Sequence, residues 1–365
     1  MKKSLIVLAT LGAFAGVASA QSSVTLFGVV DLSVNAFKNG SVSTKQMSND
    51  QLASSRLGFR GVEDLGGGLS AAFWLEAGLA TDVGGAGGSN NIQSNVANGA
   101  LFNRRATASL VSASLGELRL GRDYTNSFST AATFDAYGAN GFGNLANLYA
   151  STAAALGSGA GTQVRANNMV GYFLPSSLGG IYGSVQVAAG EGIGQAAAAA
   201  APAVVTSRFN KYTGVRLGYA AGPFNISGGA SKTETGANDY KSANIGASFN
   251  MGFATILGLY DQRKFGALKY TTAGISASVP LGQGEFRAAF AKGNSSGGSA
   301  AFNGSDSTLI GLEYIYNLSK RTALYTQFGR LDNDGGAALS LGGGGAASAL
   351  GAKSTAYGVG VRHAF

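Results

Sequence analysis

The chain is dominated by short segments in which apolar and polar residues alternate. Between residues 22 and 37, Val24, Leu26 and Leu32 share one parity, whereas Asp31 and Ser33 share the other. A period of two places successive side chains on opposite faces of a β-strand. About 16 candidate strands of roughly 7 to 16 residues follow one another in this way. The alternation therefore predicts an all-β protein whose strands have two different surroundings.

The connections between these strands alternate in length. Short turns such as 63–68 and 175–180 are followed by long connections. The long connections include 39–50, 80–100 and 123–166. Short turns on one side, long loops on the other and an even strand number are typical of an outer-membrane barrel. We expect a 16-stranded antiparallel transmembrane β-barrel with long extracellular loops and short periplasmic turns. A secreted β-sandwich or β-helix is the alternative, but no fixed short repeat is present.

Composition agrees with an apolar setting. Only 12% of the residues are charged, against roughly 25% in an ordinary soluble domain. There is no cysteine, which rules out a disulfide scaffold and fits an oxidising compartment. The formal charge of +8 permits anionic partners, but no run rich in Lys and Arg indicates nucleic acid.

The amino terminus reads as a targeting segment. Lys2 and Lys3 precede an apolar stretch from Leu5 to Val17, and Ala18-Ser19-Ala20 is a small-x-small cleavage site. This pattern is that of a secretory signal peptide. The apolar stretch is shorter than the ~20 residues that a spanning helix needs. We therefore expect a signal peptide at 1–20 and a single barrel domain at 21–365.

Parity assigns two arginines to the barrel interior. Arg56 and Arg60 alternate with Leu57 and Phe59. An arginine facing the bilayer midplane costs roughly 2–4 kcal/mol. We therefore expect Leu57 and Phe59 to face lipid and the two arginines to face the lumen. At the carboxyl end, an outward apolar stripe is expected. Its members are Tyr357, Val361 and the terminal Phe365. The stripe predicts a last strand that faces lipid, closes against the first strand and carries the assembly signal.

Several motifs in order resemble one known family, the Gram-negative general porins of the Burkholderia–Bordetella–Neisseria type. The matching segments are QSSVTLFGVVD at 21–31, SRLGFRG at 55–61, FNRRA at 102–106, LGR at 120–122, RANN at 165–168 and VRHAF at 361–365. The resemblance spans the mature chain. It implies a homotrimer in which a third loop, at about 123–165, folds inward and constricts each pore; we call this segment loop 3.

The resemblance also suggests roles for further arginines. Arg104 and Arg105 are adjacent, and parity allows only one of them to point inward. The family match places Arg104 in the pore, so we expect Arg105 at the rim or at a subunit contact. Arg165 resembles a constriction arginine. Arg122 shares the outward parity of its strand, so it is expected either at a subunit contact or solvated at the rim.

Three acidic residues are candidates to face these arginines. Asp31 shares the lumenal parity of the first strand, Asp135 is the only acid within loop 3, and Asp123 at its root is the weaker candidate. Arginines opposite loop acids would create a field across a narrow slot. Because one loop acid stands against about four arginines, we expect a modest preference for anions.

The expected function is passive diffusion of ions and small hydrophilic solutes through a general porin in the outer membrane of a Gram-negative bacterium, in contact with lipid and lipopolysaccharide. A channel specific for anionic solutes would share the fold. A barrel enzyme is the alternative from another class. The only histidine, His363, lies on the lipid-facing parity, so His-dependent hydrolysis is not expected. No metal-ligand cluster or cofactor motif is evident, and we expect neither a catalytic residue nor a cofactor.

Overall fold

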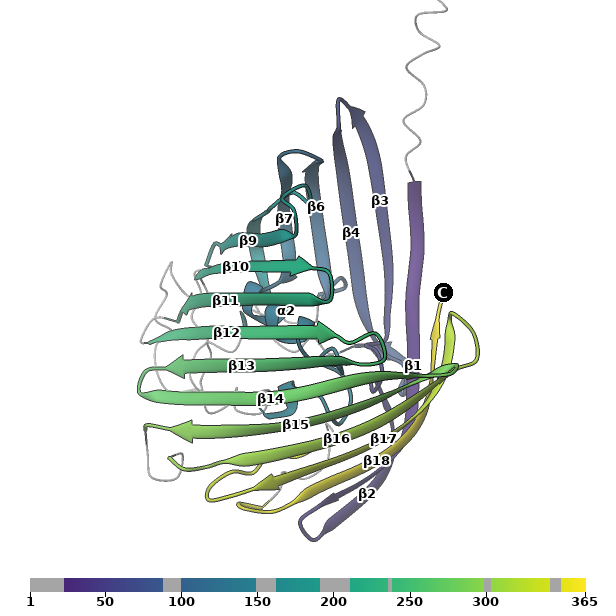
Figure 1. Ribbon diagram of the computed structural model, residues 1–365, viewed down its shortest axis with the longest axis vertical. Helices are drawn as coiled ribbons and strands as arrows, with labels where there is room; N and C mark the ends of the chain where they lie inside the picture. The colour runs from purple at the N-terminus through teal and green to yellow at the C-terminus, as the bar shows by residue number, and fades with distance from the viewer. Residues whose placement is uncertain are drawn as a thin grey trace, which may run out of the picture.

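The computed structural model describes residues 23–87, 100–148, 162–190, 211–235, 238–298, 303–341 and 349–365. The predicted signal peptide at 1–20 lies outside these residues. Where it is described, the chain is almost entirely β-structure, with the two short helices of loop 3 as exceptions (Figure 1). No helix in the described ranges is long and apolar enough to cross a membrane.

The strands follow one another in a single antiparallel sheet. Their bounds are Ser23–Asn39 (β1), Val42–Asn49 (β2), Arg56–Gly66 (β3), Leu69–Ala80 (β4), Gly85–Ala86 (β5), Arg105–Ser112 (β6), Gly116–Tyr124 (β7), Arg165–Phe173 (β8), Ile181–Ala188 (β9), Lys211–Ala221 (β10), Phe224–Glu234 (β11), Asp239–Asn250 (β12), Thr255–Phe265 (β13), Leu268–Leu281 (β14), Gly284–Ser296 (β15), Ser307–Asn317 (β16), Thr322–Asn333 (β17) and Ser354–Ala364 (β18).

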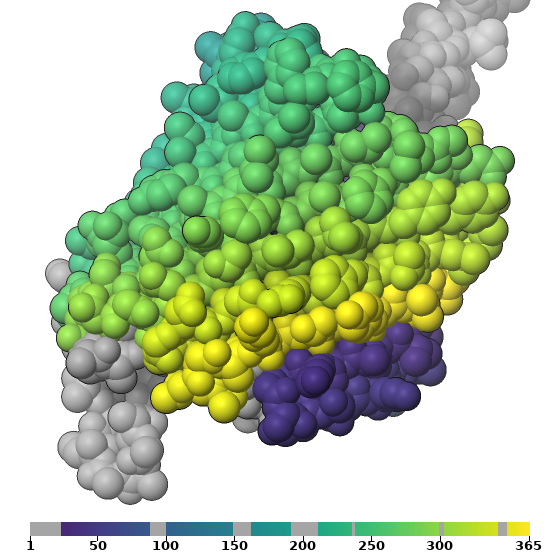
Figure 2. Space-filling model, turned by 60° about the horizontal axis from the view of Figure 1, so that its bottom comes forward, coloured from purple at the N-terminus to yellow at the C-terminus, as the bar shows by residue number. Residues whose placement is uncertain are grey.

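These strands make a closed wall of sixteen positions, as predicted. β2 and β3 share one position, because they pair with successive parts of β1. β5 is a two-residue pair on the end of β4. β1 pairs with β18 and closes the barrel, and the purple amino-terminal strands lie against the yellow carboxyl-terminal strand in Figure 2. Closure leaves no free sheet edge in the membrane.

One predicted connection is wrong. The segment 39–50 was expected to be a long loop, but β1 and β2 form a hairpin across a two-residue turn at 40–41. The irregular segment is instead 50–55, between β2 and β3, where Asp50 has a φ of 66°. β2 consists mostly of polar residues, as a loop does, so alternation of apolar and polar residues did not reveal it as a strand.

The two faces of the wall differ as alternation requires. On β1, Asp31, Ser33 and Asn35 are buried on the lumenal side, whereas Val24 and Leu26 are exposed on the outside. The same contrast holds on β18, where Tyr357 is exposed and Ala356 is buried. An apolar outer band around a polar interior is typical of a barrel that spans a lipid bilayer.

Loop 3 lies inside the barrel. It contains the helix α2 (Asn126–Thr133) and the 3-10 helix η1 (Leu145–Leu148). α2 packs on β9–β12, behind the front strands in Figure 1, and η1 packs on β14–β16. The loop is fastened by its own apolar side chains, which form the largest buried cluster with the inner wall. Its members from the loop are Ala131, Phe134, Tyr137, Phe142, Leu145 and Leu148.

The inner wall is shaped to receive this loop. Glycines stand on several strands where loop 3 approaches most closely, among them β12, β16 and β17. A Cβ at Gly246 would overlap the ring of Phe134, one at Gly311 would overlap the backbone of Gly143, and one at Gly329 would overlap Phe142. Because these positions carry no side chain, the loop lies flat against β10–β18 and leaves the opposite side of the lumen open.

Candidate functional site

Six arginines project into the lumen from the side of the barrel that loop 3 leaves open. They are Arg56 and Arg60 on β3, Arg104 just before β6, Arg105 at its start, Arg119 on β7 and Arg165 on β8. We call them the arginine face. A cavity of about 350 Å³ lies among four of them, bordered by Trp74, Glu76 and Tyr124. Interior side chains of a barrel this wide line an aqueous channel.

Arg56 and Arg60 lie on the lumenal face of β3, on either side of the buried Gly58. Phe59, between Gly58 and Arg60, is exposed on the outer face. The Arg60 guanidinium lies over two aromatic rings, 5.4 Å from the centroid of Phe27 and 5.2 Å from that of Trp74. Contact with the rings holds the cation in place without neutralising it. A role of both arginines in ion passage stays a prediction.

Arg104 and Arg105 both face the lumen, so the prediction that only one could do so is wrong. Arg104 lies before β6, where the alternation does not yet apply, and its Nε donates to Glu76 Oε1 at 2.6 Å. Arg105 is the first residue of β6 and lies over the Trp74 ring, 4.7 Å from its centroid. A contact of Arg105 with another subunit stays a prediction. In this chain its side chain points away from the outer surface.

Three carboxylates on the same side pair with part of the arginine face. Glu76 pairs with Arg104. Arg119 pairs with Glu117 at 2.7 Å and with Asp123 at 2.5 Å, and Arg105 lies 3.7 Å from Asp123. Asp123 therefore lies on the barrel wall among the arginines that it pairs with. Within the described ranges, Arg56, Arg60 and Arg165 have no carboxylate in ion-pair distance, so the face keeps an excess of positive charge.

Arg165 begins β8 and is almost fully buried. Its Nη2 donates to Tyr124 Oη at 2.9 Å, and its guanidinium lies 4.5 Å from the centroid of the same ring. Arg104 Nη2 donates to the same hydroxyl oxygen at 3.0 Å. Tyr124 stacks on Phe128 at the start of loop 3, with ring centroids 5.1 Å apart. One tyrosine thus connects two pore arginines to the root of the loop.

Arg122 keeps the outward parity that was predicted for it, since it lies opposite Ala106 on the outer side of β6. It is not solvated there. Its Nε donates to the carbonyl of Asn103 at 2.7 Å and its Nη1 to Asn167 Oδ1 at 2.5 Å. The bond to Asn167 spans an irregularity in the pairing of β7 with β8, and the bond to Asn103 reaches the segment before β6. Arg122 therefore stabilises the wall beside loop 3, and a part in a subunit contact stays a prediction.

Asp135 does not face the arginines. Its carboxylate is buried and accepts hydrogen bonds from the backbone N–H groups of Tyr137 at 3.0 Å and Leu145 at 3.1 Å, and a longer one from Ala139. Asp135 therefore connects separate parts of loop 3 through its carboxylate and stabilises the fold of the loop. Burial raises the pKa of Asp135 to about 6, against the opposing effect of these N–H donors.

Asp31 has the predicted lumenal parity but is also buried. Its carboxylate accepts the N–H groups of Leu52 and Ala53 at 2.8 and 2.6 Å and the hydroxyl of Tyr325. It therefore fixes the irregular segment between β2 and β3 and does not pair with an arginine. The sequence showed the side of the strand, but it could not show that the backbone of 50–55 turns inward to meet it.

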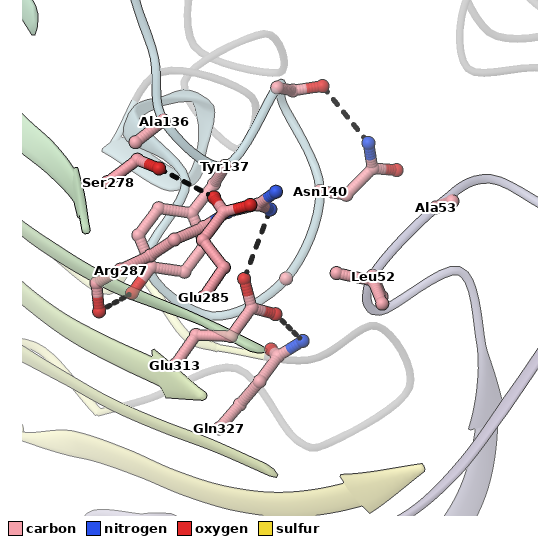
Figure 3. Close-up of polar contacts among 12 residues, drawn as sticks. Leu52, Ala53, Ala136, Tyr137, Asn140, Ser278, Glu285, Arg287, Glu313 and Gln327 are labelled. Atoms are coloured by element: carbon pink, nitrogen blue, oxygen red, sulfur yellow. Dashed lines mark hydrogen bonds and ion pairs between the residues drawn. The ribbon is translucent and has the colours of Figure 1, made fainter. Parts of the chain in front are cut away.

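A polar network lies beneath the tip of loop 3, on the wall opposite the arginine face (Figure 3). Arg287 on β15 pairs with Glu285 at 2.6 Å and with Glu313 at 3.2 Å. Gln327 donates to Glu313 at 2.7 Å, and the hydroxyl of Tyr137 points at the carbonyl of Arg287. One guanidinium faces two carboxylates, so the network supports the loop and adds no excess positive charge.

The tip of loop 3 also reaches the segment between β2 and β3. Ser54 Oγ donates to Asn140 Oδ1 at 2.9 Å. Gln327 donates to the carbonyl of Gln51 at 3.0 Å and accepts the N–H of Phe142 at 3.1 Å. Both ends of loop 3 thus lie beside Arg165, and its tip lies near Arg56. The open passage is bounded by the arginine face on one side and by an almost uncharged loop on the other.

The carboxyl-terminal residues occupy the outer face and the seam. Tyr357 and Val361 are exposed on the outside of β18. The backbone of Phe365 exchanges two hydrogen bonds with Gly28 of β1, at 3.0 and 3.1 Å, and its ring covers that glycine. Whether these residues serve as an assembly signal stays a prediction.

Sequence reasoning missed Trp74, Glu76 and Arg119 as parts of the site. All three have lumenal parity, and alternation from the outward Phe73 and Leu118 would have found them. Tyr124 had no such signal, because it is the last residue of its strand and turns with the chain into loop 3.

Comparison with known proteins identifies the family. A family model described as Gram-negative porin matches residues 4–336. Outer membrane porin protein 32 of Delftia acidovorans is 36% identical, and an outer membrane porin protein of Bordetella pertussis is 31% identical, each over the whole of both chains. An anion-selective porin from Comamonas acidovorans has a solved structure with a TM-score of 0.78 at 34% identity. That match covers 94% of this chain and all of the other.

A more distant structure, OmpF of Salmonella typhi, shares the fold alone, with a TM-score of 0.63 at 14% identity and coverage of 96% and 99%. Porins are channels of the outer membrane rather than enzymes, and this barrel has the architecture of that group. The strand order, the inward loop and the sequence matches agree along the chain, which belongs to the Gram-negative porin family.

Proposed function

We propose that this porin prefers anions among the small solutes that diffuse through it. The observation that carries the proposal is the unequal charge across the passage. Three members of the arginine face, Arg56, Arg60 and Arg165, have no ion pair with a carboxylate in the described part of the chain. The only acid of loop 3, Asp135, is buried in the loop's own backbone. Fixed charges that line a pore select ions of the opposite sign.

The physical basis is local enrichment. A unit charge about 4 Å from an ion contributes roughly 1 kcal/mol in water and more beside low-dielectric walls. Arginine keeps its charge at every physiological pH. The expected preference is modest because Arg104, Arg105 and Arg119 are partly compensated by their ion pairs. The similar porin from Comamonas acidovorans is described as anion-selective, which supports the proposal.

Reversal-potential measurement tests it. The full mature porin is placed in a planar bilayer with a KCl gradient, and the potential of zero current is recorded. Anion preference predicts the sign of the chloride equilibrium potential. A reversal potential of the potassium sign would overturn the proposal. Conductance that does not saturate with solute concentration would show general diffusion rather than a channel specific for one anion.

Three further expectations belong to the same proposal. The porin assembles as a homotrimer, in keeping with the family, so single-channel records should show steps in threes. Its outer surface contacts membrane lipid and its long loops contact lipopolysaccharide. Residues 1–20 act as a signal peptide, which mass spectrometry of the protein from outer membranes would test by placing the amino terminus at Gln21.

A further inference from the structure

A hollow opens in the lumenal wall between the arginine face and the short turns. It has a volume of about 300 Å³ and borders Trp74; we call it the Trp74 pocket. Its origin lies in the strand register. The row Thr25–Arg60–Trp74–Thr107 runs across four neighbouring strands. The next row toward the turns holds only small side chains, from Ser23 through Val62 and Ala72 to Ser109. Large side chains therefore overhang a row of small ones.

Arg60 is the cation of this pocket that has no acidic partner. Its side chain is exposed, and among the described residues no hydrogen bond or ion pair engages it. Its guanidinium lies over the rings of Phe27 and Trp74, whose centroids are 5.0 Å apart, so both rings are on the same side of it. Because no described residue bonds to its N–H groups, they can meet a ligand, and a guanidinium edge matches a carboxylate in a planar, two-bond geometry.

The rest of the pocket is lined by apolar side chains toward the turns and by hydroxyl groups next to Trp74. Val62 and Ala72 lie on the side of the turns, and Thr107 and Ser109 are buried beside the indole of Trp74. The indole is held in place because its Nε1 donates to Glu76 Oε2 at 3.0 Å. The volume is at the lower end of the ~300–1,000 Å³ of ligand pockets, so a single ring is the largest body that suits it.

A carboxylate of Glu117 lies at the far border of the pocket. It is held by Arg119, which donates to both of its oxygens at 2.7 and 2.8 Å. A ligand with one negative group can place it at Arg60 and its apolar body over Ala72. A second negative group at the opposite end would approach Glu117, which disfavours it by like-charge repulsion.

We propose that the Trp74 pocket binds small aromatic monocarboxylates beside the main path of ions. The inference deepens the proposed anion preference by naming a class of solute, and it rests on that proposal only for the passage of the ligand through the pore. Binding holds such solutes at the wall and lets them compete with chloride. General diffusion of other solutes continues beside it.

The chain contains one tryptophan, so tryptophan fluorescence reports on this pocket alone. The purified full porin in detergent is titrated with sodium benzoate at constant ionic strength, and Trp74 emission is recorded. We expect a saturable change with benzoate, a weaker one with acetate, which lacks the ring, and with terephthalate, which has two carboxylates. Neutral benzamide should give no saturation at the same concentrations.

Two variants and a control decide the outcome. Arg60→Gln should raise the half-saturating benzoate concentration at least about tenfold, because a charge-assisted pair is lost. Ala72→Leu fills the hollow and keeps every charge, so it should abolish saturation even if the first variant folds poorly. Arg321→Gln, in the exposed turn between β16 and β17, should behave as the parent.

A linear response to benzoate in the parent, or equal saturation in the parent and Ala72→Leu, would overturn the inference. The proposed function fails by a different result, a reversal potential of the potassium sign in KCl without benzoate. The two failures are therefore separable. Saturation in a cation-preferring channel would leave the pocket standing, and anion preference without saturation would remove only the pocket.

Discussion

Arg104 and Arg165 donate to one phenolic oxygen, that of Tyr124, at 3.0 and 2.9 Å. Two cations, one just before β6 and one at the start of β8, are thereby held side by side where the chain leaves the wall and enters loop 3. Like charges at this spacing repel each other, and the shared acceptor offsets part of that repulsion. The positions of the pore charges and the start of the constriction loop are coupled through a single hydroxyl.

Removing that hydroxyl tests the coupling. Tyr124→Phe keeps the ring that stacks on Phe128 but removes the acceptor of two charge-assisted hydrogen bonds, each worth about 1.5–3 kcal/mol. We expect a folded barrel whose anion preference is lower and whose open-channel current is noisier. Single-channel recording measures both. Parent-like current and selectivity would show that the ring alone holds the two arginines.

The double variant Arg56→Ala with Arg60→Ala should shift the reversal potential toward cations. It removes two of the lumenal charges that lack a carboxylate partner, and the loss should be greatest at low salt, where screening is weak. The matched control is Arg321→Ala, which removes an exposed arginine outside the lumen. If the double variant and the control give the same reversal potential as the parent, the two β3 arginines do not set selectivity.

Gly246→Ala should displace loop 3. An added Cβ would overlap the ring of Phe134, so about 1–3 kcal/mol of overpacking is expected, and the loop must move into the passage. Conductance should fall while the barrel remains closed. Gly258→Ala is the control, because a Cβ there finds its nearest atom at 4.0 Å. Equal conductance of the two variants would contradict the close packing of the loop on the wall.

Asp135 gives a pH dependence with a defined sign. Burial raises its pKa to about 6 from an ordinary value of 3.8, so the folded protein binds the proton more tightly than the unfolded chain. Its contribution to stability is therefore complete below pH 3.8 and is lost as the pH rises through about 6. Thermal unfolding followed from pH 4 to 7 should show this decline in the parent. Asp135→Asn, which does not titrate, should lack it; parallel curves would refute the assignment.

The strands and their two faces could be predicted from the sequence, because lipid on one side and water on the other impose alternation that is visible residue by residue. Arg56 and Arg60 lie inside as parity requires. Arg105 did not follow the prediction, because its neighbour Arg104 lies before the strand and both can turn inward. Alternation constrains side chains only within a strand.

The errors about the acids have a different origin. Asp31 and Asp135 were read as charges that face the pore, but each is satisfied by backbone N–H groups of an irregular segment, at 52–53 and at 137–145. Where such a segment folds depends on the surface that receives it. For loop 3 that surface consists of strands far away in sequence, so the residues of the loop alone did not reveal its path.

The glycines of the inner wall that receive loop 3 have a consequence for the order of assembly. Loop 3 precedes β10–β18 in the chain, yet Gly246, Gly311 and Gly329, which receive it, belong to those later strands. The loop has nowhere to dock until they are paired. The narrowest point of the passage therefore forms after the part of the wall that carries these glycines.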